Sequence, residues 1–180
     1  MPTPQELRSI RLGNDYKEMV RIRGGVISWK PLRGTPPNVE EFEITANIRT
    51  IYGIDSSGCP MYRTNNVVRL LIPDNYPIGA PQITMITRPA PFHPNWWESG
   101  KWCYGTWMPS ESLGNFVIRM IKTLQFDQSI TNPESPANRD ANVWYLSNKY
   151  SGWFPCDKQQ PPDPTSAFSS SGGTFAIKRK

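Results

Sequence analysis

The hydrophobic pattern at the start of the chain predicts an amphipathic helix over residues 6–22. Leu12, Tyr16, Met19 and Val20 follow one another at the spacing i, i+4, i+7 and i+8. That spacing places the four apolar side chains on one face of a helix. We therefore expect this helix to pack against a hydrophobic layer formed by the rest of the chain.

Four segments rich in β-branched and aromatic residues follow, at 25–32, 42–52, 61–72 and 81–86. Turn-forming residues such as Gly, Pro, Asp and Ser separate them, mainly at 33–37 and 55–60. Successive strands joined by short turns pair with one another along the chain. The pattern therefore predicts a four-stranded antiparallel meander sheet.

An irregular segment follows the last predicted strand. Residues 89–109 hold four Trp, four Pro and the only His of the chain, with neither helical nor alternating periodicity. A long irregular stretch inside a compact domain is usually functional. Helical spacing then returns over 113–124, and a loop at 127–132 precedes a last predicted helix over 136–150. This order of elements predicts an α+β domain with helices packed against one sheet.

Length and composition favour a single domain. A chain of 180 residues with 37% apolar residues can enclose one sizeable core, which we assign to residues 1–150. Residues 151–180 are expected to form a tail, extended or flexible where Pro, Ser and Gly dominate at 159–173. No apolar run approaches a membrane span, and the first residues lack the pattern of a secretory signal. We expect a soluble, cytoplasmic protein with no membrane partner.

Charge and cysteine content narrow the choice of chemistry. The net charge of +5 allows attraction to acidic surfaces, but the one tight basic run is at 178–180, so no nucleic-acid partner is expected. Three widely spaced cysteines offer neither a complete disulfide framework nor the paired ligands of a zinc site. We expect a structural role for Cys59 and Cys156, no bound metal, and a chemical role for Cys103.

A series of short motifs surrounds Cys103. Residues 76–81 read Tyr-Pro-Ile-Gly-Ala-Pro, residues 93–95 read His-Pro-Asn, and Cys103 lies ten positions after the histidine. Residues 107–109 read Trp-Met-Pro, and residues 132–138 read Asn-Pro-Glu-Ser-Pro-Ala-Asn. In this order the motifs resemble the ubiquitin-conjugating enzyme family. The resemblance covers about residues 6–150 and implies the UBC-like fold, with its active-site loop between the sheet and the C-terminal helices.

The resemblance implies a role for each residue of the active-site loop. Cys103 matches the acceptor cysteine, which carries a ubiquitin-like protein as a thioester. His93 matches a histidine that holds the loop, and Asn95 matches an asparagine that supports the loop and the developing oxyanion. Ser135 matches the gate position beside the cysteine. No small-molecule cofactor is implied, because ATP is consumed by the activating enzyme.

The resemblance also implies a set of protein partners. These are ubiquitin or a ubiquitin-like modifier, its activating enzyme and a protein substrate, with or without a ligase. Ile78, Met108 and Pro109 match two loops that the family presents to activating enzymes and ligases. With them we group Arg8 and Arg11, two cations near one edge of the apolar face of the first helix.

Several departures from the family pattern indicate a divergent member. The segment from Cys103 to Trp107 is shorter than in typical relatives, and the loop before Asn132 is longer. Gly105 stands where many relatives have an acidic residue. Divergent conjugating domains also occur in bacterial operons, some of them antiviral, so the resemblance extends to modifiers other than ubiquitin.

Transfer to an amine makes demands beyond those of thioester formation. A lysine with a pKa near 10.4 is neutral in only about one molecule in 2,500 at pH 7, so the site must favour the neutral amine. Gly105 cannot orient an amine, which leaves Glu98, Glu134 and Ser135 as local candidates. We hypothesise that Glu134 and Ser135 shape the channel for the acceptor.

Alternatives stand beside each assignment. Cys103 could be a buried small hydrophobe, Asn95 a turn residue, and Ser135 the N-cap of a helix that begins at Pro136. His93 could activate the thiol, which would make the protein a cysteine hydrolase. A non-catalytic scaffold of the same fold that binds ubiquitin-like chains is the other alternative. The clustered tryptophans could stack on a partner or belong to the core.

Overall fold

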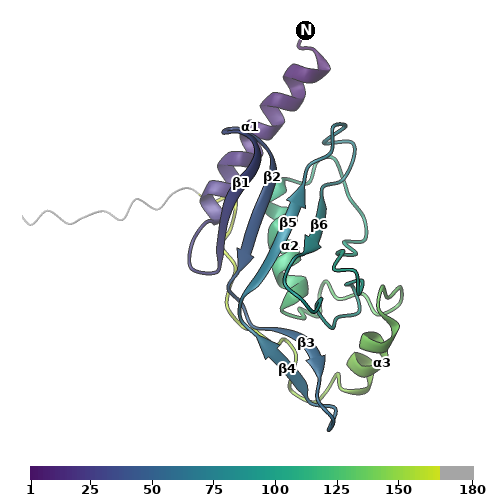
Figure 1. Cartoon of the computed structure of the whole chain (residues 1–180). Coiled ribbons are helices and arrows are strands. Elements are labelled where there is room, and N and C mark those ends of the chain that lie inside the picture. Colours follow the sequence, from purple (N-terminus) through teal and green to yellow (C-terminus); the bar gives the residue numbers. More distant parts are fainter. Residues whose placement is uncertain (167–180) are drawn as a thin grey trace, which may run out of the picture.

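The computed structural model describes residues 1–166 (Figure 1). Its elements follow one another as α1 (Pro4–Ile22), β1 (Ile27–Thr35), β2 (Asn38–Ala46), β3 (Thr50–Ile54), β4 (Pro60–Arg63), β5 (Asn66–Leu71), β6 (Gln82–Met85), α2 (Leu113–Leu124) and α3 (Arg139–Ser147). This order confirms the predicted α+β architecture, in which an N-terminal helix precedes the strands and two helices follow the irregular segment. Within residues 1–166, no helix has both the length and the apolar character required to cross a bilayer.

Helix α1 begins with a complete capping box. The Thr3 hydroxyl accepts a hydrogen bond from the Glu6 backbone N–H, and the Glu6 carboxylate accepts one from the Thr3 N–H. Leu12 and Met19 of the predicted apolar face are buried, and they pack on the sheet together with other members of that face. The predicted helix at 6–22 is confirmed, and the cap explains its earlier start at Pro4.

The main sheet has the strand order β1-β2-β5-β6, and all its pairs are antiparallel. Its inner face is apolar and packs against α1 and α2, which lie on the same side of the sheet (Figure 1). Its outer face carries ion pairs such as Lys30–Glu43 and Arg69–Glu41. The predicted four-stranded antiparallel sheet is confirmed, although its strands do not have the predicted bounds. The buried inner residues include Ile27, Trp29, Phe42, Ile44, Val68, Leu70, Ile83 and Met85.

Two predicted strands are each divided between two sheets. The segment 42–52 supplies the end of β2 and the start of β3, and 61–72 supplies most of β4 and all of β5. Asn66 stabilises the division, because its buried side-chain amide donates to the carbonyls of Ala46 and Ile48 at the bend. Strands β3 and β4 therefore leave the main sheet and form a separate two-stranded sheet beside α3 (Figure 1).

A second core lies beside β3 and β4, and it includes residues that follow position 150. Phe154 and Cys156, which belong to the expected tail, are buried in it together with Ile51 and Phe126. The backbone N–H of Cys156 also donates to the Gln125 carbonyl at the end of α2. The segment just after residue 150 is thus packed because its aromatic side chains complete this core, whereas residues 167–180 of the expected tail lie outside the described part.

Helix α3 begins at Arg139, so the prediction that Ser135 caps a helix starting at Pro136 is wrong. Asn138 is the N-cap, and its side-chain oxygen accepts from the Ala141 N–H at 3.0 Å. The N–H groups of Ala137 and Asn138 both donate to the carbonyl of Pro94. Because these contacts hold 135–138 against the active-site loop, the helix cannot start earlier.

Candidate active site

Cys103 lies in a short segment that is fixed beside the edge of the main sheet. The Trp102 N–H donates to the Ile83 carbonyl of β6 at 3.0 Å, and the Cys103 N–H donates to the Asn95 carbonyl at 2.9 Å. Trp96 and Trp102 are buried and stack on each other with their ring centroids 6.3 Å apart. These two rings anchor the segment in the core, while Cys103 itself stays half-buried with a free thiol.

The Cys103 segment forms one side of a cleft of about 270 Å³. Helix α2 and the loop before α3 supply the other sides. In the described part of the chain, none of the residues that line the cleft is acidic. They are Asn95, Trp102, Cys103, Tyr104, Gly105, Arg119, Thr123, Ile130, Asn132 and Ser135.

The backbone conformation at position 105 explains why this residue is a glycine. Gly105 has a φ of 74°, in the left-handed region that side chains with a Cβ rarely adopt. A Cβ atom added there would meet nothing within 4 Å, so the constraint comes from backbone conformation rather than from space. An acidic residue at this position would therefore strain the short turn after Cys103.

Asn95 joins the two walls of the cleft. Its buried side-chain amide forms two hydrogen bonds with the backbone of Asn132, one as donor at 3.1 Å and one as acceptor at 3.0 Å. Its own carbonyl accepts the hydrogen bond from Cys103. The asparagine therefore fixes the thiol segment relative to the loop that carries Ser135.

His93 is fully buried and does not line the cleft. Its Nδ1 accepts a hydrogen bond from the Asn95 backbone N–H at 2.9 Å, and its ring packs on Phe126 at a centroid distance of 4.1 Å. Burial lowers the pKa of His93 to about 3, and an interaction with the Thr123 backbone offsets only part of this shift. No hydrogen bond between His93 and Cys103 is present in residues 1–166, and the observed contacts of the histidine are with the loop backbone and Phe126.

The three candidates for orienting an amine have separate locations. Ser135 lines the cleft. Glu134, the residue before Ser135, is exposed, and its N–H donates to the Asn132 side chain. Glu98 lines a different hollow, beside the start of α3. The structure thus brings Ser135 to the cysteine and leaves both carboxylates outside the lining of the cleft.

Sequence reasoning missed Arg119, a lining residue on α2. Its guanidinium forms two hydrogen bonds of 2.9 Å with the Glu111 carboxylate. The available signal was a cation within the apolar run of α2, which follows an acidic residue by eight positions. This pattern is weak by itself, because a single charge on a helix is usually exposed to solvent.

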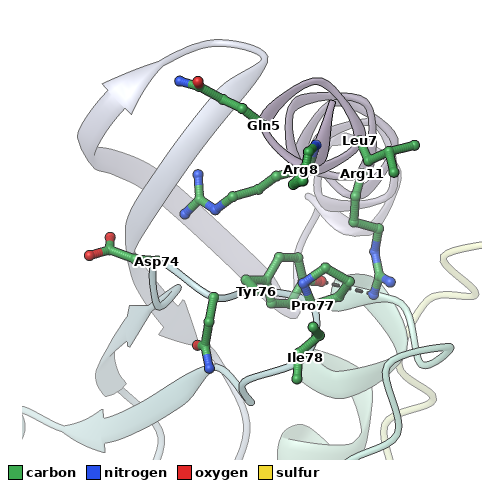
Figure 2. Close-up of a pocket in the computed structure, with 10 residues that line it drawn as sticks. Gln5, Leu7, Arg8, Arg11, Asp74, Tyr76, Pro77 and Ile78 are labelled. Atoms are coloured by element: carbon green, nitrogen blue, oxygen red, sulfur yellow. Dashed lines mark hydrogen bonds between the residues drawn. The ribbon is translucent and has the colours of Figure 1, made fainter. Parts of the chain in front are cut away.

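Three of the predicted partner-binding residues, Arg8, Arg11 and Ile78, line a groove between α1 and residues 74–78 (Figure 2). The groove has a volume of about 670 Å³, and Leu7 and Ile78 expose apolar side chains beside it. Ile78 is 78% exposed. Met108 and Pro109 are also exposed but do not line this groove.

Arg8 and Arg11 line the groove, but neighbouring residues already bind both guanidinium groups. Arg8 forms an ion pair of 2.7 Å with Glu40. Arg11 pairs with the buried Asp15 at 2.8 Å and donates to the Tyr76 hydroxyl, as Figure 2 shows, and to the Pro109 carbonyl. Arg11 therefore connects α1 to the loop that carries Met108 and Pro109.

The remaining cysteines and tryptophans have distinct environments. Cys156 is buried, and burial raises the pKa of its thiol to about 12. Cys59 is exposed in the turn between β3 and β4. Trp97 is exposed and Trp107 half-buried, unlike the two core tryptophans described above.

Within residues 1–166, no three His, Cys, Asp or Glu side chains gather in a way that could hold a metal ion. The chain matches no protein-family model and no curated protein. The case for a function therefore rests on the residues around Cys103.

Proposed function

We propose that this protein is a ubiquitin-conjugating-type enzyme. It accepts the C-terminus of ubiquitin or a ubiquitin-like modifier from an activating enzyme as a thioester on Cys103. It then transfers the modifier to an amine of a protein substrate, directly or with a ligase. The observation that carries the proposal is the half-buried Cys103 in a cleft whose two walls are joined by Asn95.

Loading is a thiol–thioester exchange, in which the modifier moves from the cysteine of the activating enzyme to Cys103. The Cys103 thiolate attacks the modifier's terminal carbonyl, the new C–S bond forms, and the thiolate of the activating enzyme leaves. Thiol–disulfide and thioester exchange both depend on access to the sulfur as well as on its ionisation. The partial exposure of Cys103 and the absence of a hydrogen bond to His93 support a carrier thiol rather than a hydrolase nucleophile.

Transfer requires stabilisation of negative charge on the thioester oxygen. The amine nitrogen attacks the carbonyl, a tetrahedral oxyanion forms, and Cys103 leaves as the C–S bond breaks. The Asn95 amide has two hydrogens, and the Asn132 carbonyl accepts one of them. The second hydrogen is the candidate donor to the oxyanion, a contribution of about 3 kcal/mol for a well-placed group.

The incoming amine must lose a proton, and no carboxylate of residues 1–166 lines the cleft. Ser135 in the lining and Glu134 beside it are the groups best placed to orient the amine at the entrance. Replacing both with Ala tests this role. Unchanged transfer to free lysine would show that neither side chain contributes.

The groove of Figure 2 is the proposed docking surface for the activating enzyme or a ligase. Leu7 and Ile78, with Met108 and Pro109 nearby in the fold, offer apolar contacts. Arg8 and Arg11 contribute to this surface mainly by fixing its shape, because both are already paired.

Two alternatives make different predictions. A scaffold that binds ubiquitin-like chains would not need an accessible thiol. A Cys103/His93 hydrolase would need an imidazole that can accept a proton near neutral pH, whereas His93 is fully buried with its pKa lowered to about 3. The geometry around Cys103 therefore favours the conjugating enzyme over both.

A loading assay tests the proposal. The protein is mixed with ATP, modifier and activating enzyme, starting with ubiquitin and its own activating enzyme, and run on gels with and without reductant. We expect a band that reductant removes and that Cys103→Ala lacks. A complete system with its cognate modifier that yields no such band would favour the scaffold.

A further inference from the structure

The segment after Cys103 has no regular secondary structure, yet one side chain holds it. Arg119 donates from Nη1 to the carbonyl of Tyr104 and from Nη2 to the carbonyl of Thr106 at 3.2 Å. Both carbonyls belong to the short turn that contains Gly105. A single guanidinium therefore fixes the backbone immediately after the proposed acceptor cysteine.

The guanidinium is itself held in place. The Glu111 carboxylate accepts hydrogen bonds from its Nε and Nη2, both at 2.9 Å. The Arg119 cation also lies 5.4 Å from the ring centroid of Trp102, the residue before Cys103, and 5.3 Å from that of Phe116. With a carboxylate on one side and aromatic rings on another, the planar group has one favourable orientation.

We infer that Arg119 is a positioning residue for Cys103, and that Glu111 locks it in place. The arginine holds Tyr104 and Thr106 by their carbonyls and packs on Trp102, so it restrains the chain on both sides of the cysteine. It thereby sets the depth and orientation of the thiol in the cleft. The consequence for thioester chemistry rests on the proposed function, but the restraint on the thiol does not.

Lysine cannot replace Arg119 in this role. An ammonium group keeps the positive charge and can still pair with Glu111, but it lacks the planar fork that reaches a carboxylate and two carbonyls together. Arg119→Lys therefore separates the effect of charge from that of positioning. Lys122→Ala provides a matched control, because it removes a cation one turn further along α2 that does not line the cleft.

The alkylation rate of Cys103 tests this inference, and the other two cysteines serve as internal references. Alkylation by iodoacetamide is followed at each thiol by peptide mass spectrometry, and the Cys103 rate is divided by the rate of exposed Cys59 in the same molecule. Buried Cys156 reports any general opening of the fold. Loss of the restraint raises the exposure of Cys103, so Arg119→Lys and Glu111→Gln are expected to increase the ratio by about fivefold or more.

In the same variants, we expect transfer from a loaded Cys103 to slow while the KM for loading changes little. Because general destabilisation would also raise alkylation and slow transfer, the rate at Cys156 decides between the two, and we expect it to stay unchanged. A Cys103/Cys59 ratio equal to that of wild type and Lys122→Ala would overturn the inference, as would a parallel rise at Cys156. A raised ratio in a protein that never forms a thioester would count against the proposed function alone.

Discussion

The side-chain amide of Asn95 forms two hydrogen bonds, opposite in direction, with the backbone of Asn132, 37 residues later in the chain. Its own carbonyl accepts the N–H of Cys103. The same amide is the candidate donor to the oxyanion. The Asn95 side chain therefore both positions Cys103 and is proposed to stabilise the oxyanion. Its replacement should affect loading and transfer to different extents.

Replacing Asn95 with Ala should slow transfer far more than loading. Transfer loses a donor to the developing oxyanion, which corresponds to about a hundredfold in rate, whereas loading depends mainly on access to Cys103. Single-turnover discharge to lysine, measured beside the rate of loading, checks this expectation. Lys122→Ala is the control, because Lys122 does not line the cleft and the variant keeps the groups that Asn95 binds. Equal losses in both steps would indicate a collapsed loop.

His93 should stay neutral through the whole physiological range. It is the only histidine of the chain, so its ring gives a single set of NMR signals during a pH titration. Burial lowers the pKa to about 3, and we expect no titration of the ring between pH 5 and 8. A midpoint near 6.5 would contradict its placement and would restore the cysteine hydrolase as an alternative.

The same shift predicts how acid affects stability. As the pH falls below about 6.5, unfolded chains bind a proton at His93 that the folded chain does not bind. The stabilisation from neutral His93 is therefore complete above that pH and is lost as the pH falls towards about 3. Denaturation curves at several pH values should show a flatter acid limb for His93→Gln, if both proteins fold.

Asp15 should be more important for stability than any sequence pattern suggests. This buried carboxylate binds Arg11, the Tyr76 hydroxyl at 2.5 Å and the Leu113 N–H at the start of α2 at 3.0 Å. Removal of one partner from a buried ion pair costs about 3 kcal/mol or more. Chemical denaturation of Asp15→Ala should show this loss. Exposed Asp74→Ala, the control, should change stability by less than about 0.5 kcal/mol.

The segment after residue 150 gives another measurable contrast. Phe154 is 9% exposed and packs on Phe126 with ring centroids 4.9 Å apart, whereas Tyr150 is 94% exposed. Truncation of a buried Phe to Ala typically costs about 3 kcal/mol. We expect that loss for Phe154→Ala and almost none for Tyr150→Ala. Equal stability of the two variants would contradict the packing of this segment in the second core.

Local signals made much of the fold predictable. The spacing of Leu12 and Met19 predicted α1, and the apolar repeat at 113–124 predicted α2 with the bounds that the structure shows. The division of two strands was not predictable in this way. It depends on Asn66, whose role comes from carbonyls about twenty residues earlier in the chain.

For the candidate site too, local motifs were predictable and contacts between distant segments were not. The motifs around Cys103, Asn95 and Ser135 predicted residues that do lie together in one cleft. The contribution of Arg119 could not be predicted, because its partners are two carbonyls and a carboxylate that only the packing of α2 brings within reach. The start of α3 was predicted too early for a similar reason. The Pro94 carbonyl, which is distant in the sequence, accepts hydrogen bonds from the residues just before Arg139.

The most direct measurement of the central claim is the site of attachment of the modifier after incubation with ATP and the cognate activating enzyme. Intact-mass and peptide mass spectrometry should locate one modifier on Cys103 of the wild-type protein, with the bond lost on reduction. Cys103→Ser should retain the modifier as an oxyester that reductant does not remove. Attachment at Cys59, or a reducible adduct that persists in Cys103→Ala, would contradict the account.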